Sequence, residues 1–423
     1  MLAARTSASR ATRAVRHFAT AVDAAGVKVA AADNGEATST VTFLVKAGSR
    51  YQNKPGVAHA LTNFAFKSTG KRSGLATIRE AELYGGVLSS SLSREHLALT
   101  AEFLRGDESY FVDVLSSFVT DAKFTRHELQ EYVAPVCAAE AAAAASNPAA
   151  RALELAHVLA FRNGLGAPLL SAEHDPVDVE AIKEYASTVF SKGNIAVLGT
   201  GISQEALTSL LEKSLNTLSA SGAPSASASR YFGGETRVEG HGGPETVFIG
   251  FGTTGAPAAE LAVLTAHLST KPSIKWSQGL SPIAASLPAG ATVEAVLLPY
   301  SDAALFGLLV QGATAEAVKA AGTAAVKALK DAANVKEEDL KRAVAKAKFF
   351  AASATDGKAG QVAVVGSKVL SGAQPSLDEA LSAFEKVNAS AVSNAVSSLL
   401  KAKPTYVAVG DIKTLPYADE LGL

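Results

Sequence analysis

Three residues of one expected helix, His59, Thr62 and Asn63, have the spacing of a metal-hydrolase motif but not its residue types. In H-x-x-E-H, two histidines one helical turn apart bind zinc, and the intervening glutamate accepts a proton from the metal-bound water. Thr62 stands at the position of the glutamate and cannot act as that base. Asn63 stands at the second histidine, where a neutral amide is a poor zinc ligand. The motif therefore predicts a hydrolase scaffold that no longer cleaves.

Glu140 is the one acid in an alanine-rich stretch, residues 138–145, that is expected to be helical. One interpretation makes its carboxylate a third metal ligand, brought to His59 from another helix. The other makes it an ordinary solvated side chain on a helix surface, and the stretch taken alone favours this second interpretation. His59 and Glu140 without another good ligand would form only a weak two-ligand site.

The segment from Gly250 to Gly255 fits G-x-G-x-x-G between an expected strand and an expected helix, which is the context of a dinucleotide-binding turn. The acid that would bind the ribose about 20 residues later is missing, because no Asp or Glu occurs between Glu260 and Glu294. The glycines, with Pro257 at the first helical turn, are therefore interpreted as turn residues. Other histidines have no ligand spacing and are expected on the surface or satisfied in the core: His96, His127, His157, His174, His241 and His267.

The elements that would position these residues occur twice along the chain. In each half a strand leads into a helix, two paired strands and a run of helices follow, and a short apolar strand closes the half. The expected strands are 40–47, 87–94, 97–104 and 194–199, then 245–251, 292–298, 304–311 and 405–410. The expected helices are the His59 helix, 111–122, 127–145 and 149–161, then 258–268, 313–330, 337–350 and 360–370. Paired strands beside long helical runs predict two α+β domains.

Length and composition fit this duplication. A chain of 423 residues with 48% hydrophobic and 19% charged residues can build two domains of about 200 residues, each with a core. The small-residue tract 218–232 is interpreted as a flexible linker between domains at 19–217 and 233–423. The formal charge of −1 gives no basis for binding nucleic acid or an anionic membrane. The one cysteine, Cys137, excludes an internal disulfide and is expected to be a buried structural thiol.

Residues 1–18 differ in character from the rest of the chain. They hold arginines at positions 5, 10, 13 and 16 among Ser and Thr, and no acid occurs before Asp23. On a helix, at about 100° per residue, these arginines fall on one side and apolar residues gather on the other. The pattern is typical of a mitochondrial transit peptide, with a disordered basic tail as the alternative. No uninterrupted apolar run reaches the roughly 18 residues of a membrane span.

The segment 56–69 (GVAHALTNFAFKST) resembles the active-site helix of the pitrilysin-type metallopeptidases, in the branch of the mitochondrial processing peptidase. Segments 146–164, 300–308 and 408–421 are similar to core proteins of mitochondrial ubiquinol–cytochrome c reductase (complex III). The resemblance implies two homologous domains, each a mostly antiparallel sheet packed against helices, the second without a metal site. Carried over position by position, it places His59 on the first zinc ligand, Thr62 on the general base, Asn63 on the second ligand and Glu140 on the third.

The resemblance implies a noncatalytic core subunit that supports assembly of complex III from the matrix side of the mitochondrial inner membrane. Its implied partners are a homologous core protein one, cytochrome b, cytochrome c1 and other subunits of a dimeric complex. No cofactor or bound metal is expected, because the sequence offers neither clustered cysteines nor axial ligands. One alternative is the noncatalytic presequence-binding subunit of the processing peptidase, although the region 279–290 is only modestly glycine-rich. Another is a residual peptidase that uses His59 and Glu140.

Overall fold

A computed structural model describes residues 22–24, 26–33, 35–171, 177–220, 226–240, 242–272, 281–371 and 377–423. These residues form two compact units that do not simply follow the two halves of the sequence. Unit 1 takes the described residues up to Ala141, Pro168–Ala226 and Ala352–Leu377. Unit 2 takes Ala142–Ala167, Ser227–Ala351 and Asp378–Leu423. Unit 1 therefore contains Ala352–Leu377 from the second half of the sequence, and unit 2 contains Ala142–Ala167 from the first half. The predicted division into 19–217 and 233–423 did not include this exchange.

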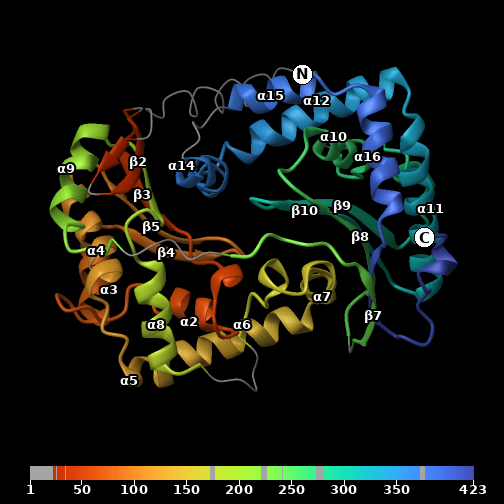
Figure 1. Ribbon diagram of the computed structural model, residues 1–423. Helices are drawn as coiled ribbons and strands as arrows, with labels where there is room; N and C mark the ends of the chain where they lie inside the picture. Colours follow the sequence, from red (N-terminus) through yellow and green to blue (C-terminus); the bar gives the residue numbers. More distant parts are fainter. Residues whose placement is uncertain are drawn as a thin grey trace. The chain divides into compact units, whose positions relative to one another are not determined.

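Unit 1 is built on a six-stranded sheet with the strand order β1-β2-β6-β3-β5-β4 (Figure 1). The β2–β6 pair is parallel, and the other neighbouring strands are antiparallel. The strands are β1 Val22–Ala24, β2 Val27–Ala32, β3 Thr38–Val45, β4 Val87–Leu92, β5 Leu97–Leu104 and β6 Ile195–Thr200.

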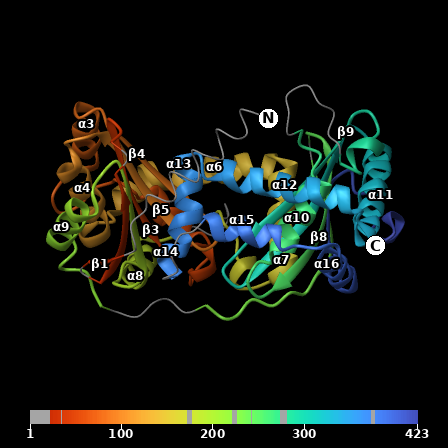
Figure 2. The ribbon, with the colours of Figure 1, turned by 90° about the horizontal axis from the view of Figure 1, so that it is seen from above.

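Helices cover both faces of this sheet because its side chains alternate between them. Val41 and Phe43 of β3 belong to the core formed with α2, α4, α8 and α9, whereas Leu44 points to the opposite face. There a π-helical turn, Val362–Gly366, and α14 pack on the sheet (Figure 2), with Gly366 directly against Leu44. The helices of unit 1 are α2 Val57–Asn63, α3 Gly74–Leu83, α4 Glu108–Asp121, α5 Arg126–Glu128, α6 Ala134–Ser146 (which continues into unit 2), α8 Val179–Val189, α9 Gln204–Ser214, α13 Lys358–Gln361 and α14 Ser367–Ser371.

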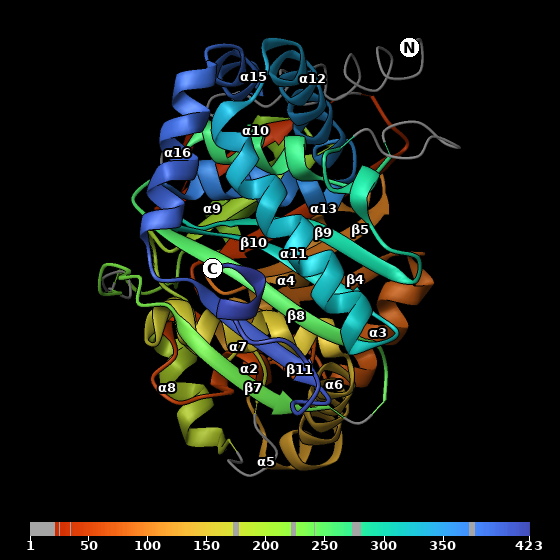
Figure 3. The same cartoon turned by 90° about the vertical axis from the view of Figure 1, so that its right-hand side faces the viewer.

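Unit 2 repeats this plan on a five-stranded sheet with the order β7-β11-β8-β10-β9, in which only the β7–β11 pair is parallel. Helix α11 crosses one face (Figure 3), and α7 covers the other through its small residues Ala152, Ala156 and Ala160. The strands are β7 Gly234–Glu239, β8 Glu245–Thr254, β9 Ala291–Pro299, β10 Ala303–Gly312 and β11 Thr405–Gly410. The helices are α7 Pro148–Phe161, α10 Ala259–Leu268, α11 Ala315–Asp331, α12 Glu337–Ala354, α15 Leu377–Glu385 and α16 Ala389–Lys401.

The α+β class with two related units is confirmed, and the interpretation of the glycine motif as a turn is partly wrong. Gly250 and Gly252 lie inside β8, and only Gly255, with φ +98°, has a turn conformation. Gly252 is needed for space, because a Cβ there would lie 2.2 Å from the ring of Tyr231. The predicted transit peptide, residues 1–18, falls outside the described residues, and so does the 221–225 part of the predicted linker.

Candidate functional site

The site begins with α2, whose start depends on Gly56. Gly56 has φ +83°, a left-handed conformation that favours glycine, and a Cβ at this position would lie 2.6 Å from the Cβ of Ser171. The helix that follows buries Val57 and Leu61 in the core of unit 1. The same helix carries His59, Thr62 and Asn63, the three residues of the degenerate motif.

His59 is 2% exposed and hydrogen-bonded through both ring nitrogens. Its Nδ1 lies 3.1 Å from the backbone nitrogen of Ser171 and 3.1 Å from the Ser171 hydroxyl, and its Nε2 lies 2.7 Å from Oε2 of Glu140. A backbone N–H can only donate, so Nδ1 is the acceptor. The ring proton of neutral His59 is therefore assigned to Nε2, which donates it to Glu140.

Thr62 and Asn63 complete the cluster without supplying a base or a ligand lone pair. The Thr62 hydroxyl donates to the carbonyl of Ala58 at 2.8 Å, so it is occupied within the helix. The amide nitrogen of Asn63 lies 3.0 Å from Oε2 of Glu140, to which it donates, and 3.5 Å from the sulfur of Cys137. All four predicted positions are thus brought together, with hydrogen-bond donors facing the Glu140 carboxylate.

Helix α6 supplies Cys137 and Glu140, one turn apart and on the same side. A π-helical turn, Leu129–Val133, precedes α6 and changes the register of the residues that follow it. Cys137 is buried, as expected, and burial raises the pKa of its thiol to about 11. The preference for a merely solvated Glu140 is wrong: its side chain is 51% exposed, yet it accepts hydrogen bonds from both His59 and Asn63.

The donor set of this cluster does not fit a catalytic zinc ion. Catalytic zinc sites use three protein ligands, whereas only His59 and Glu140 among the four motif positions offer a donor atom that zinc favours. Across the described ranges, no three His, Cys, Asp or Glu side chains are grouped so as to hold a metal.

Ser171, His59 and Glu140 superficially form the chain of contacts seen in serine hydrolases. However, the Nδ1 lone pair already accepts the backbone N–H of Ser171, so it is not free to act as the base for the Ser171 hydroxyl. The arrangement holds three segments together by hydrogen bonds, and it leaves the Ser171 hydroxyl without a free base beside it.

Two of the other histidines, His157 and His127, behave as predicted, whereas His96 and His267 are half-buried. His157 is buried, with Nδ1 2.6 Å from the Leu153 carbonyl and Nε2 2.6 Å from the Tyr300 hydroxyl. His127 forms an exposed ion-pair contact with Glu131. Burial lowers the pKa of His96 and of His267. His174 and His241 lie outside the described residues.

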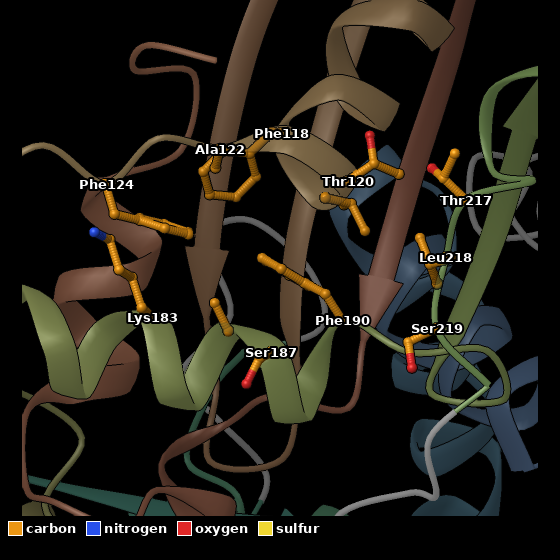
Figure 4. A pocket seen from close by; sticks show the side chains of 12 residues that line it. Phe118, Thr120, Ala122, Phe124, Lys183, Ser187, Phe190, Thr217, Leu218 and Ser219 are labelled. Atoms are coloured by element: carbon orange, nitrogen blue, oxygen red, sulfur yellow. The ribbon is translucent and has the colours of Figure 1, made fainter. Parts of the chain in front are cut away.

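A hollow of unit 1 lies between the end of α4, the end of α8 and residues 217–219, and has a volume of about 380 Å³ (Figure 4). Phe118, Phe124 and Phe190 form its floor, and Lys183 lies at its edge. Phe124 has φ +45°, an uncommon conformation for a bulky residue, and its ring packs edge-on against Phe118. Lys183 is the sole titratable side chain of the lining, so the hollow offers apolar contact rather than acid–base chemistry.

Ser171 is the residue of this site that no sequence pattern predicts. Ser171 lies 112 residues from His59, beyond the end of α7, and no motif marks it. It is recognised only from the folded chain, because it approaches α2 at the position where Gly56 leaves space.

Comparison with known proteins places these features in context. The family described as "Insulinase (Peptidase family M16)" matches residues 28–173, the part that contains His59 and Glu140. A protein of Cryptococcus neoformans named "Cytochrome b-c1 complex subunit 2, mitochondrial" is 46% identical over 419 residues, covering 97% of this chain and 96% of the relative. Proteins of the same name from Yarrowia lipolytica and Homo sapiens are 38% and 28% identical; the alignments cover 96% and 94% of this chain, and 97% and 90% of those relatives.

Proposed function

Because this chain belongs to the family of mitochondrial cytochrome b-c1 complex subunit 2 proteins, we propose that it is a core subunit of complex III that supports the respiratory complex without catalysing a reaction itself. The observation that carries this proposal is the extent of the similarity. The 46% identity with the Cryptococcus relative runs over 419 residues and so includes both units, not only the peptidase-like segment.

The noncatalytic part of the proposal rests on the hydrogen bonds of the vestigial site. Thr62 offers no proton acceptor where a peptidase needs a general base, and its hydroxyl is held by the Ala58 carbonyl. Asn63 directs an amide N–H toward Glu140, at the point where the second histidine would direct a lone pair toward zinc. Two of the four positions have therefore lost the required chemistry, and His59 has been recruited as a hydrogen-bond donor.

The proposed partners are the homologous core protein one, cytochrome b and cytochrome c1, in a dimeric assembly. The proposed location is the matrix side of the inner membrane, as a peripheral subunit. Among the helices in the described ranges, none combines the length and apolarity that crossing a bilayer requires. Attachment through other subunits is in keeping with that finding.

The proposed division of the chain is a transit peptide at 1–18, an inactive peptidase-like domain at 19–217, a linker at 218–232 and a second peptidase-like domain at 233–423. The two compact units support a chain of two parts, in which each part also contains a helical segment from the other half of the sequence. The N-terminal sequence of the mature protein would test the first boundary: a start near residue 19 is expected, and a retained Met1 would contradict it.

The proposed role is tested by native gel separation of detergent-solubilised mitochondria, with mass spectrometry locating this chain. We expect it in one large assembly together with cytochrome b and cytochrome c1. A small soluble heterodimer with a partner that carries an intact H-x-x-E-H would refute the core-subunit role and favour a presequence-binding subunit. Metal analysis of the purified chain separates both from a residual peptidase, which alone requires stoichiometric zinc.

A further inference from the structure

The hollow shown in Figure 4 lies within unit 1 and shares no residue with the vestigial site. Its walls come from the end of α4, the end of α8 and residues 217–219. Its volume of about 380 Å³ is near the lower end of the roughly 300–1,000 Å³ found for small-molecule sites. The hollow therefore has room for one small ligand, but not for the two acyl chains of a phospholipid.

Aromatic packing fixes the apolar floor of this hollow. The ring of Phe118 packs edge-on against Phe124 and Phe190, with centroid distances of 6.1 and 5.6 Å. Each of these three residues is at most 7% exposed, so the rings are held in place by the core before any ligand arrives. A floor that is already formed lowers the conformational cost of binding.

The lining carries one cation and, among the residues that the structure describes, no acid. Lys183 is exposed at the edge of the hollow, and it forms no ion pair or hydrogen bond with any described residue. Glu180, one turn away on α8, makes no ion pair with it either. The remaining polar groups of the lining are neutral hydroxyls, those of Thr120, Ser187, Thr217 and Ser219.

This charge pattern selects a class of ligand. A cationic ligand would find no carboxylate in the hollow, and a polyanion such as a nucleotide would find a single lysine. A molecule with one anionic group and an otherwise apolar body matches both the free ammonium group and the phenylalanine floor.

We propose that the hollow binds a medium-chain fatty acid such as decanoate, with its alkyl tail on the phenylalanine floor and its carboxylate at Lys183. The tail requires only apolar contact, which Phe118, Phe124 and Phe190 supply. The carboxylate remains at the exposed edge, where it keeps part of its hydration while it contacts the lysine. This binding role is separate from the proposed role in complex III.

Isothermal titration of the purified full chain with hexanoate, octanoate and decanoate, below the concentrations at which they aggregate, tests the tail. Each added CH2 should lower the Kd about fourfold, which corresponds to about 0.8 kcal/mol per buried CH2. The Kd should stop falling once the tail fills the hollow. Absence of binding, or equal affinity for the three acids, would overturn the proposal.

Reversal of the charge at Lys183 tests the carboxylate contact. Lys183→Glu should weaken decanoate binding by about 20-fold, because the lost attraction and the new repulsion each contribute roughly fivefold at an exposed site. The variant should bind decanol as before and gain affinity for decylamine, with an unchanged thermal midpoint. Lys213→Glu, the same change on α9 outside this hollow, is the matched control and should bind decanoate normally. Equal decanoate affinity in the two variants would contradict the proposed contact.

A decanoate analogue with a photoreactive diazirine in its tail locates the site. Crosslinks should map by mass spectrometry to residues 118–124, 183–190 and 217–219, and labelling confined to other segments would refute the assignment. The same labelling is expected in the large assembly recovered from mitochondria. Protection of these residues there would also overturn the proposal, since a partner chain would then cover the hollow. None of these outcomes bears on membership of complex III, which the native gel decides.

Discussion

Replacing His59 by alanine should destabilise unit 1 substantially, although the residue stands at a former catalytic position. The change removes the hydrogen bonds of Nδ1 with Ser171 and of Nε2 with Glu140, and leaves the Ser171 N–H without its acceptor. Two lost hydrogen bonds at about 1 kcal/mol each, together with one unsatisfied part-buried donor, give a cost of about 3 kcal/mol. The space vacated by the 2% exposed ring adds to this cost.

Urea unfolding followed by circular dichroism measures this cost, and hydrogen exchange of residues 57–63 assigns the transition to unit 1. His127→Ala is the matched control. Its ring also contacts a glutamate at 3.0 Å, but both side chains are about 60% exposed, so its loss should change the free energy of unfolding by less than about 0.5 kcal/mol. Glu140→Gln keeps a side-chain oxygen that accepts from His59 and Asn63, and should also have a small effect.

The tautomer is tested directly by nitrogen-15 chemical shifts of the His59 ring. A protonated Nε2 and an unprotonated Nδ1 are expected at neutral pH, with no change on adding zinc. A proton on Nδ1, or a destabilisation of the alanine variant below about 1 kcal/mol, would refute the view that His59 is retained as a hydrogen-bond donor.

Three further outcomes follow from other parts of the structure. Burial alone would raise the pKa of Glu128, but hydrogen bonds from Ser68 and Thr125 outweigh it and lower that pKa. Glu128→Gln should therefore cost about 1 kcal/mol at pH 7, and acid titration of unfolding should show the difference disappearing as the pH falls below the usual glutamate range. Arg237 donates to three carbonyls of the C-terminal segment, so Arg237→Lys should cost about 2 kcal/mol and make residues 411–423 more sensitive to limited proteolysis; an unchanged cleavage rate would contradict this. Gly252→Ala should lower the free energy of unfolding of unit 2 by about 1–3 kcal/mol in urea, since the added Cβ meets the Tyr231 ring; unaltered stability would show that the ring moves freely.

Elements with a strong local pattern were predictable from the sequence, and elements whose pattern depends on distant contacts were not. The strand pair β4–β5 and helices α4, α7 and α11 alternate or repeat regularly, so the expected ranges agree with the observed ones to within a few residues. Helix α3 was not predicted, because its large apolar residues point outward. Strand β2 was also not predicted, because its sequence VKVAAA does not alternate clearly between polar and apolar residues.

The site was partly predictable for the same reason. His59, Thr62 and Asn63 lie on one helical turn, so spacing alone was enough to group them. Glu140 was ambiguous, since an isolated acid in an alanine helix gives no sign of what it faces. Ser171 was missed because its contact with His59 depends on a loop that follows α7. Spacing in the sequence predicts which residues are neighbours on one helix. The tautomer of His59, however, depends on contacts with Ser171 and Glu140, which lie on two other segments.

The exchange of helical segments has a consequence for how the chain is synthesised. The second face of the unit 1 sheet is covered by residues up to Ser371, so it stays open until 371 of the 423 residues have been made. Helix α7, which belongs to unit 2, packs on a sheet that also stays incomplete during that time, because its strand β11 is made only at residues 405–410. Unit 1 cannot be completed before residue 371 or unit 2 before β11, and such long-range dependence slows folding and exposes apolar surface to aggregation. Both cores therefore stay incomplete until synthesis is nearly finished. We expect chaperones to remain bound to the chain during that time.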